Sequence, residues 1–129
     1  MGVKICAFFS VIGVAVGAFL GGMDGLVTAL IAAVAIDYIT GVVNAIHERK
    51  LSSEVGFKGI AKKVLIFLLV GFANILDVHV LGGVAALRGA VIFFYLANEG
   101  LSIVENFARL GVPFPERIKD VLLQLKDKK

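Results

Sequence analysis

Four long blocks of almost uncharged residues constrain the fold of this chain more than any other feature. Residues 5–23 carry no charged side chain, and residues 25–46 carry only Asp37. Residues 64–82 and 84–104 are also apolar, with a few ionisable groups in each. About 20 apolar residues suffice for a helix to cross the hydrocarbon core of a bilayer. The sequence therefore predicts an all-α membrane protein with four transmembrane helices, arranged as two hairpins around one basic cytoplasmic loop.

The composition excludes an ordinary soluble domain and argues against an enzyme. Hydrophobic residues make up 59% of the 129 residues, against about 45–50% in soluble domains. The single cysteine, Cys6, cannot form an internal disulfide, and no pair of Cys or His residues has the spacing of a metal site. The chain also has no nucleotide-binding glycine motif and no HExxH motif. We therefore expect a single membrane domain over residues 1–129 that is not an enzyme and needs no cofactor or metal.

The basic residues test this topology independently, because Lys and Arg accumulate on the cytoplasmic side of short loops. The chain has 13 of them, and only Arg88 lies inside a predicted span. With four spans the others all fall on one face of the membrane: Lys4, Arg49, Lys50, Lys58, Lys62, Lys63, Arg109, Arg117, Lys119, Lys126, Lys128 and Lys129. Both termini are therefore expected in the cytoplasm. The net charge of +3 then indicates a membrane surface as partner, and no nucleic acid.

Two other topologies compete with four spans. A chain with three spans, in which part of residues 80–104 lies at the interface, would place basic segments on both faces of the membrane. A cleaved signal peptide would use Lys4 and the apolar run that follows it. That run is too long for a signal peptide, however, and no A-x-A cleavage site follows it.

Small residues recur at four-residue spacing in the first two apolar blocks. This spacing places them on one face of a helix, where two helix backbones can approach closely. The residues concerned are Gly13, Gly17, Gly21, Ala33, Gly41 and Ala45. They predict either tight packing of the first two spans within one chain or packing between copies in a homo-oligomer.

The ionisable groups inside the spans should turn toward protein or water, because a charge in hydrocarbon costs at least about 2.5 kcal/mol on insertion scales. Asp77 and Arg88 fall at similar depths in the third and fourth spans, which predicts an ion pair between them. Asp37 and Glu99 fall at similar depths nearer the cytoplasm. We expect an intramembrane polar seam built from Asp37, Asn74, Asp77, Arg88 and Glu99. The seam either holds the helices of one chain together or lines water.

Two basic segments are expected at the membrane surface. After Pro113 and Pro115, residues 118–125 repeat apolar side chains at helical spacing. This predicts a short amphipathic helix in the basic tail, residues 113–129, that lies on the anionic inner leaflet or docks on a neighbouring subunit. In the other segment, residues 47–63, Ser52 and Ser53 are candidate helix caps before Glu54. The basic residues assigned to the membrane surface are Lys58, Lys62, Lys63, Lys119 and Lys126.

Five short strings together carry a resemblance to a known family. They are DYITG at 37–41, KLSS at 50–53, GFKGIAKK at 56–63, NEGLSIVEN at 98–106 and GVPFP at 111–115. In this order and spacing, over about residues 35–125, the chain resembles the phage lysis and toxin-secretion holin family.

The resemblance implies a small multi-pass protein of the bacterial inner membrane. Such a protein accumulates during phage infection and then oligomerises into lesions, through which an endolysin reaches the cell wall and the host lyses at a set time. In some clostridial relatives the cargo is a toxin, and an antiholin is a further partner that the resemblance allows. The residues themselves leave two other functions open, a small ion channel or transporter and a membrane scaffold.

Overall fold

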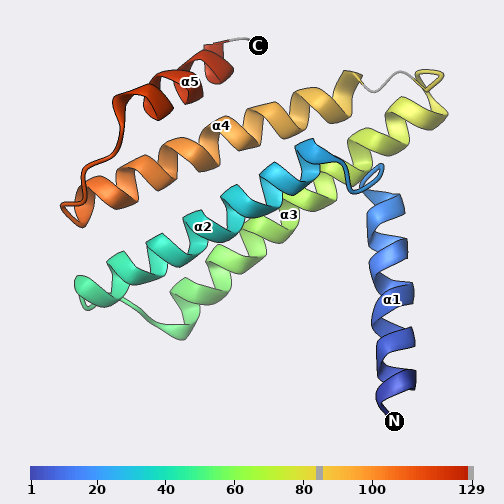
Figure 1. The fold of residues 1–129 in the computed structure, drawn as a ribbon, viewed down its shortest axis with the longest axis horizontal. Coiled ribbons are helices and arrows are strands. Elements are labelled where there is room, and N and C mark those ends of the chain that lie inside the picture. The colour runs from blue at the N-terminus through green and yellow to red at the C-terminus, as the bar shows by residue number, and fades with distance from the viewer. Residues whose placement is uncertain (84–85, 128–129) are drawn as a thin grey trace.

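In the computed structural model of the protein, the residues described, 1–83 and 86–127, form five helices (Figure 1). The helices are α1 (Gly2–Phe19), α2 (Gly25–His47), α3 (Ser53–His79), α4 (Ala86–Arg109) and α5 (Glu116–Asp127). The first four are long and apolar enough to cross a membrane, as expected from the four blocks. The predicted C-terminal helix is α5. The expected start of the fourth span at residue 84, and Lys128 and Lys129 of the tail, lie outside the described residues.

The third helix is longer than its apolar block. Residues 47–63 were expected to form a basic loop, but α3 begins at Ser53 and only residues 48–52 connect it to α2. The cap is the reason: the Ser52 hydroxyl accepts a hydrogen bond from the Val55 N–H at 3.2 Å, which satisfies one of the free donors of the first turn. Lys58, Lys62 and Lys63 therefore lie on a helix rather than in a loop.

Three helices, α2, α3 and α4, form the bundle, and α4 packs against both of the others (Figure 1). We call the end where α2 and α4 begin and α3 finishes the turn end, and the opposite end the basic end. Seven buried side chains form the apolar core: Leu20, Val27, Leu30, Val34, Ile66, Val70 and Ile92. Most of the remaining large apolar side chains of these helices point outward. Such an exterior suits lipid as its surroundings.

The first helix points away from the bundle (Figure 1). Among the other helices it contacts α3 alone, where the Phe19 ring lies in the space that a side chain at Gly71 would fill. Only 6% of its apolar window is buried within the chain. The two N-terminal helices therefore do not pack side by side as the expected hairpin, and α1 presents almost its whole apolar surface to its surroundings.

The C-terminal helix runs back along α4 (Figure 1). The chain turns at Gly111, whose φ of +75° favours glycine, and the Phe107 and Phe114 rings meet edge to face at 5.2 Å. The Leu122 side chain then occupies the space that a Cβ at Gly100 would need. Thus α5 packs on its own chain, an arrangement distinct from both surface sites expected from the sequence.

Adding a methyl group at Gly100 should loosen α5. The Gly100→Ala variant places its Cβ against Leu122, and overpacking of this kind costs about 1–3 kcal/mol. We expect trypsin to cleave at Arg117 and Lys119 about tenfold faster in this variant, as local opening becomes easier. Gly89→Ala is the matched control, because a Cβ at Gly89 of the same helix meets nothing within 4 Å. Equal cleavage rates in the two variants would contradict the Leu122 contact.

Candidate functional site

A single lysine joins two carboxylates between the three helices of the bundle. The Lys63 Nζ of α3 donates hydrogen bonds to Asp37 Oδ2 of α2 and to Glu99 Oε2 of α4, each at 2.8 Å. The exposed fractions of the three side chains are only 17%, 14% and 8% respectively. We call these three residues the Lys63 bridge. It ties all three helices together, and it brings together Asp37 and Glu99, which the sequence placed at similar depths.

A layer of amides continues the bridge toward the basic end. The Asn106 Nδ2 of α4 donates to Asp37 Oδ1 at 3.0 Å and to the Thr40 hydroxyl at 2.8 Å. The Asn44 Nδ2 of α2 donates in turn to the Asn106 backbone carbonyl at 3.2 Å. In the described part of the chain, no buried side-chain nitrogen or oxygen lacks a partner. The buried polar groups of the bundle are thus satisfied internally, which removes most of the cost of placing them in an apolar environment.

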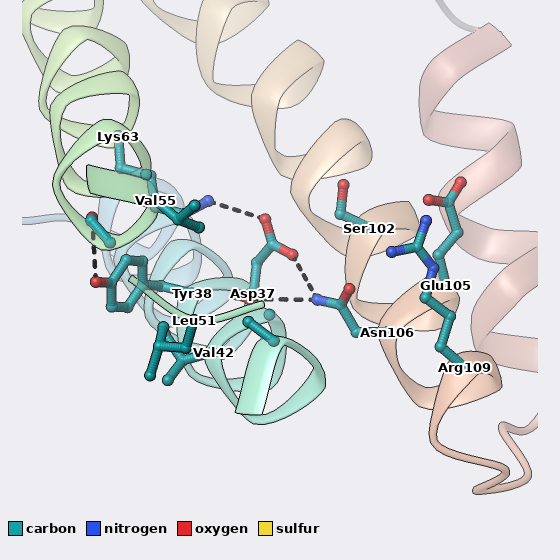
Figure 2. Close-up of a pocket in the computed structure, with 14 residues that line it drawn as sticks. Asp37, Tyr38, Val42, Leu51, Val55, Lys63, Ser102, Glu105, Asn106 and Arg109 are labelled. Carbon is teal, nitrogen blue, oxygen red and sulfur yellow. Dashed lines mark hydrogen bonds and ion pairs between the residues drawn. The ribbon is translucent and has the colours of Figure 1, made fainter. Parts of the chain in front are cut away.

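A pocket of about 290 Å³ opens beside this network at the basic end (Figure 2). The Tyr38 hydroxyl donates to the Gly56 carbonyl at 3.2 Å, and the Tyr38 ring lies so close to Gly59 that a Cβ there would be only 3.2 Å from it. On the opposite wall, α4 presents Ser102, Glu105 and Arg109 (Figure 2). Four of the five strings that carry the family resemblance contribute to this lining: 37–41, 50–53, 56–63 and 98–106. Most of the strings that carry the family resemblance therefore meet around this pocket in the fold.

A second polar cluster holds the turn end together. The buried Arg88 guanidinium donates to both Asp24 carboxylate oxygens, at 2.8 and 3.2 Å, and to the backbone carbonyls of Leu20 and Gly22. Gly21 has a φ of +90°, and a Cβ there would overlap the Arg88 and Asn74 side chains, so this turn requires glycine. We call Arg88 and the groups that it binds the Arg88 clamp. It fixes the connection between α1 and α2 against α4.

The predicted Asp77–Arg88 ion pair is wrong. The Asp77 carboxylate accepts hydrogen bonds from the backbone N–H groups of Leu87 and Arg88, at 3.0 and 2.8 Å, and so caps the N-terminus of α4 from α3. A carboxylate at a helix N-terminus is favoured by the free N–H groups and by the helix dipole. The Arg88 side chain is consequently free to reach Asp24, which lies just outside the apolar blocks.

The stability of this clamp should depend on pH. The Arg88 hydrogen bond, together with the backbone N–H of Val27, holds the pKa of the Asp24 carboxyl below its ordinary value of 3.8. A lowered folded-state pKa stabilises the fold above about pH 3.8, and this contribution is lost as the pH falls through the folded-state pKa. We expect the melting temperature of the native chain to fall more steeply below pH 4 than that of Asp24→Asn. Asp120→Asn on α5 is the control, and parallel curves for Asp24→Asn and the native chain would contradict the clamp.

The small residues divide into two groups. In α1, Gly13 is exposed with open space around it, whereas Gly17 is buried against Met23. Gly21 does not share their helix face as expected, because α1 ends at Phe19. In α2, Ala33 is buried in the bundle and Gly41 and Ala45 line the pocket. The face in α2 thus packs within the chain, while the face at Gly13 stays open.

Two other residues singled out from the sequence, Asn74 and Lys63, do not lie where they were expected. Asn74 donates to the Phe19 carbonyl at 3.3 Å, so it holds the end of α1 instead of facing Asp37. Lys63 was assigned to the membrane surface but forms the buried bridge, because two carboxylates meet it there. Lys58, Lys62, Lys119 and Lys126 are exposed on α3 and α5.

Sequence reasoning missed Asn106, Tyr38 and Asp24 as members of these clusters. Asn106 lies four residues after Ser102 and seven after Glu99, on the same face of α4, and this helical spacing was the available signal. For Tyr38 the signal was its place beside Asp37 and opposite a glycine pair, Gly56 and Gly59. Nothing in the sequence pairs Asp24 with Arg88, because their contact depends on how the turn folds back.

Comparisons with known proteins identify a family that this chain matches. The chain matches the bacteriophage holin family over residues 3–127. It is 46% identical to an uncharacterized protein of Listeria innocua over 111 aligned residues, and the aligned region covers 86% of this chain and 79% of that protein. It is 47% identical to a probable holin of Bacillus phage phi105 over 88 aligned residues, and the aligned region covers 67% of this chain and 64% of that protein. No solved structure matches the chain.

Proposed function

Because the chain belongs to the bacteriophage holin family, a family of membrane pore-forming proteins and not of enzymes, we propose that it permeabilises the bacterial inner membrane. Copies accumulate in the membrane and then oligomerise into lesions. An endolysin, or a secreted toxin, leaves the cytoplasm through these lesions, and the host cell lyses at a set time. An antiholin is a further partner consistent with this role.

The observation that carries the proposal is the combination of an internally satisfied polar interior with an unpartnered first helix. The Lys63 bridge and the Arg88 clamp bind buried charges within one copy. A single copy can therefore sit in a bilayer without an open polar surface. If the bundle helices separate in an assembly, the same groups are available to line water: Asp37, Asn74, Asp77, Arg88 and Glu99.

The topology proposed for this function places both termini in the cytoplasm. The exposed basic side chains of α3 and of the first turn of α5, with Arg49, Lys50 and Arg109, gather at the basic end of the bundle. Lys126 lies farther from this end, because α5 runs back along α4. The turn end carries Asp24, His79 and glycines, and its only Lys or Arg side chain among the described residues, Arg88, is buried. This asymmetry supports a cytoplasmic basic end by the positive-inside rule.

The exposed α1 supplies the surface for association between copies. Gly13 allows a second helix to approach closely, and a Cβ there meets nothing within 4 Å in one chain. The Gly13→Leu variant should therefore fold normally but lose most of its cross-linked dimers, when Cys6 on α1 is joined between two copies by a bis-maleimide. It should also delay or abolish lysis. Ala15→Leu, on the opposite face of α1, is the control, and equal cross-linking in both variants would exclude the Gly13 face.

The function is tested by expression in a bacterium with and without a cytoplasmic muralytic enzyme, while culture density and membrane potential are followed. We expect the potential to collapse abruptly after a delay, with lysis only when the enzyme is present. Sustained growth with an intact potential, at confirmed membrane expression, would favour a scaffold and contradict hole formation.

A further inference from the structure

Three polar side chains of the pocket at the basic end have no partner among the described residues. Ser102, Glu105 and Arg109 line the pocket from one face of α4, three and four residues apart. None of them makes a hydrogen bond or ion pair to the described residues, unlike the neighbouring Asp37 and Asn106. A concave site with a few convergent polar groups is the usual form of a ligand site. These three groups are therefore available to a bound molecule.

The other polar side chains of the lining already have partners within the chain: Asp37, Tyr38, Lys63 and Asn106. The remaining lining residues are apolar or lack a side chain. Val42, Leu51 and Val55 lie across the pocket from α4 (Figure 2). Glycines at positions 41, 56 and 59 also line the pocket, and those of α3 let the Tyr38 side chain approach closely. At about 290 Å³ the pocket is at the lower end of the range for small-molecule sites. It suits the polar part of an amphiphile, with apolar surface beside it for the remainder.

The pocket also lies at the level expected for lipid headgroups. Lys63 lines it and is the last charged residue of α3 before the apolar run that begins at Val64, while Lys58 lies one to two turns toward the basic end. Under the topology of the proposed function, on which this step rests, this level faces the cytoplasmic leaflet. The nearest abundant amphiphile is then a membrane phospholipid.

We propose that this pocket binds the phosphoethanolamine group of a phospholipid. The Arg109 guanidinium offers a forked donor for the phosphate, a pairing that is strong and geometrically specific. The Glu105 carboxylate accepts from the ammonium, and the two side chains start from Cβ atoms about 5–6 Å apart, as i and i+4 neighbours on one helix. The Ser102 hydroxyl adds a donor to the same face. An anionic headgroup would satisfy Arg109 but leave Glu105 without a cation, so the site favours the zwitterion.

The test is native mass spectrometry of the full chain in detergent, titrated with phosphatidylethanolamine and phosphatidylglycerol of matched acyl chains. We expect the native chain to bind phosphatidylethanolamine roughly tenfold more tightly, as one charge-assisted hydrogen bond implies. Glu105→Gln should bind both lipids equally, and Arg109→Gln should bind both weakly. Glu116→Gln, an exposed carboxylate outside this pocket, is the control and should keep the preference.

Two results would overturn the proposal. Equal binding of both lipids by the native chain would show that Glu105 selects nothing, and an unchanged preference in Glu105→Gln would place the headgroup elsewhere. Soluble glycerophosphoethanolamine distinguishes the source of the group: if it competes as well as the lipid, the ligand is a free cytoplasmic compound and the lipid assignment is wrong. Because binding is measured without lysis, a negative result here leaves the proposed function standing.

Discussion

The Lys63→Met variant should lose about 3–5 kcal/mol of stability, because it leaves two carboxylates buried without their shared cation. Water and other basic side chains cannot easily replace Lys63 there, since the Glu99 side chain is only 8% exposed. We expect a large fall in the melting temperature of the variant in detergent, measured by circular dichroism, and little protein in the membrane fraction.

The neighbouring Lys62 provides a matched control. It is exposed on the same turn of α3, so Lys62→Met should leave the melting temperature almost unchanged. Adding Asp37→Asn and Glu99→Gln to Lys63→Met should recover much of the lost stability, because the buried charges then disappear together. If Lys62→Met and Lys63→Met destabilise the protein equally, the bridge does not hold the bundle together.

The Arg88→Met variant should release α1 from its fixed direction. It removes the forked contact to Asp24 and two bonds to backbone carbonyls, and hydrogen bonds to charged groups contribute about 1.5–3 kcal/mol each. Cys6, the only cysteine, and a second cysteine introduced by Lys58→Cys allow spin labels on α1 and on the bundle. We expect a narrow distance distribution in the native background and a broad one in Arg88→Met.

Two further variants identify the cause of that change. Asp24→Asn should broaden the distribution less, because an asparagine still caps α2 and still offers Arg88 one oxygen. Arg109→Met removes an exposed arginine from the same helix and should leave the distribution narrow. An equally narrow distribution in Arg88→Met would show that the Phe19 contact with Gly71 alone fixes α1.

The predicted spans and the real helices agree where hydrophobic length decides the structure. Apolar blocks of about 20 residues have few alternatives to a helix that spans the membrane. The start of α3 was not found in this way, because Lys58, Lys62 and Lys63 were interpreted as loop residues. The Ser52 cap and the shared cation at Lys63 keep this charged stretch helical. Local capping and tertiary pairing outweigh composition there.

The depth of a polar residue in the membrane, counted along its span, was not enough to predict which partner it contacts. Counting residues along each span placed Asp37 level with Glu99, and the Lys63 bridge joins them. The same counting paired Asp77 with Arg88, but a carboxylate near a helix start has the backbone N–H groups as a competing partner. The direction of α1 was also not predictable, because it follows from the turn at Gly21 and from the Arg88 clamp.

The central claim, that copies of this chain assemble into large holes above a threshold density, is tested most directly in vesicles. The purified protein is reconstituted at increasing surface density with a small dye and a protein-sized dextran inside. The account predicts almost no release at low density, followed by simultaneous release of both markers above a threshold. Graded release of the dye at every density, with the dextran always retained, would contradict it and indicate a small selective channel.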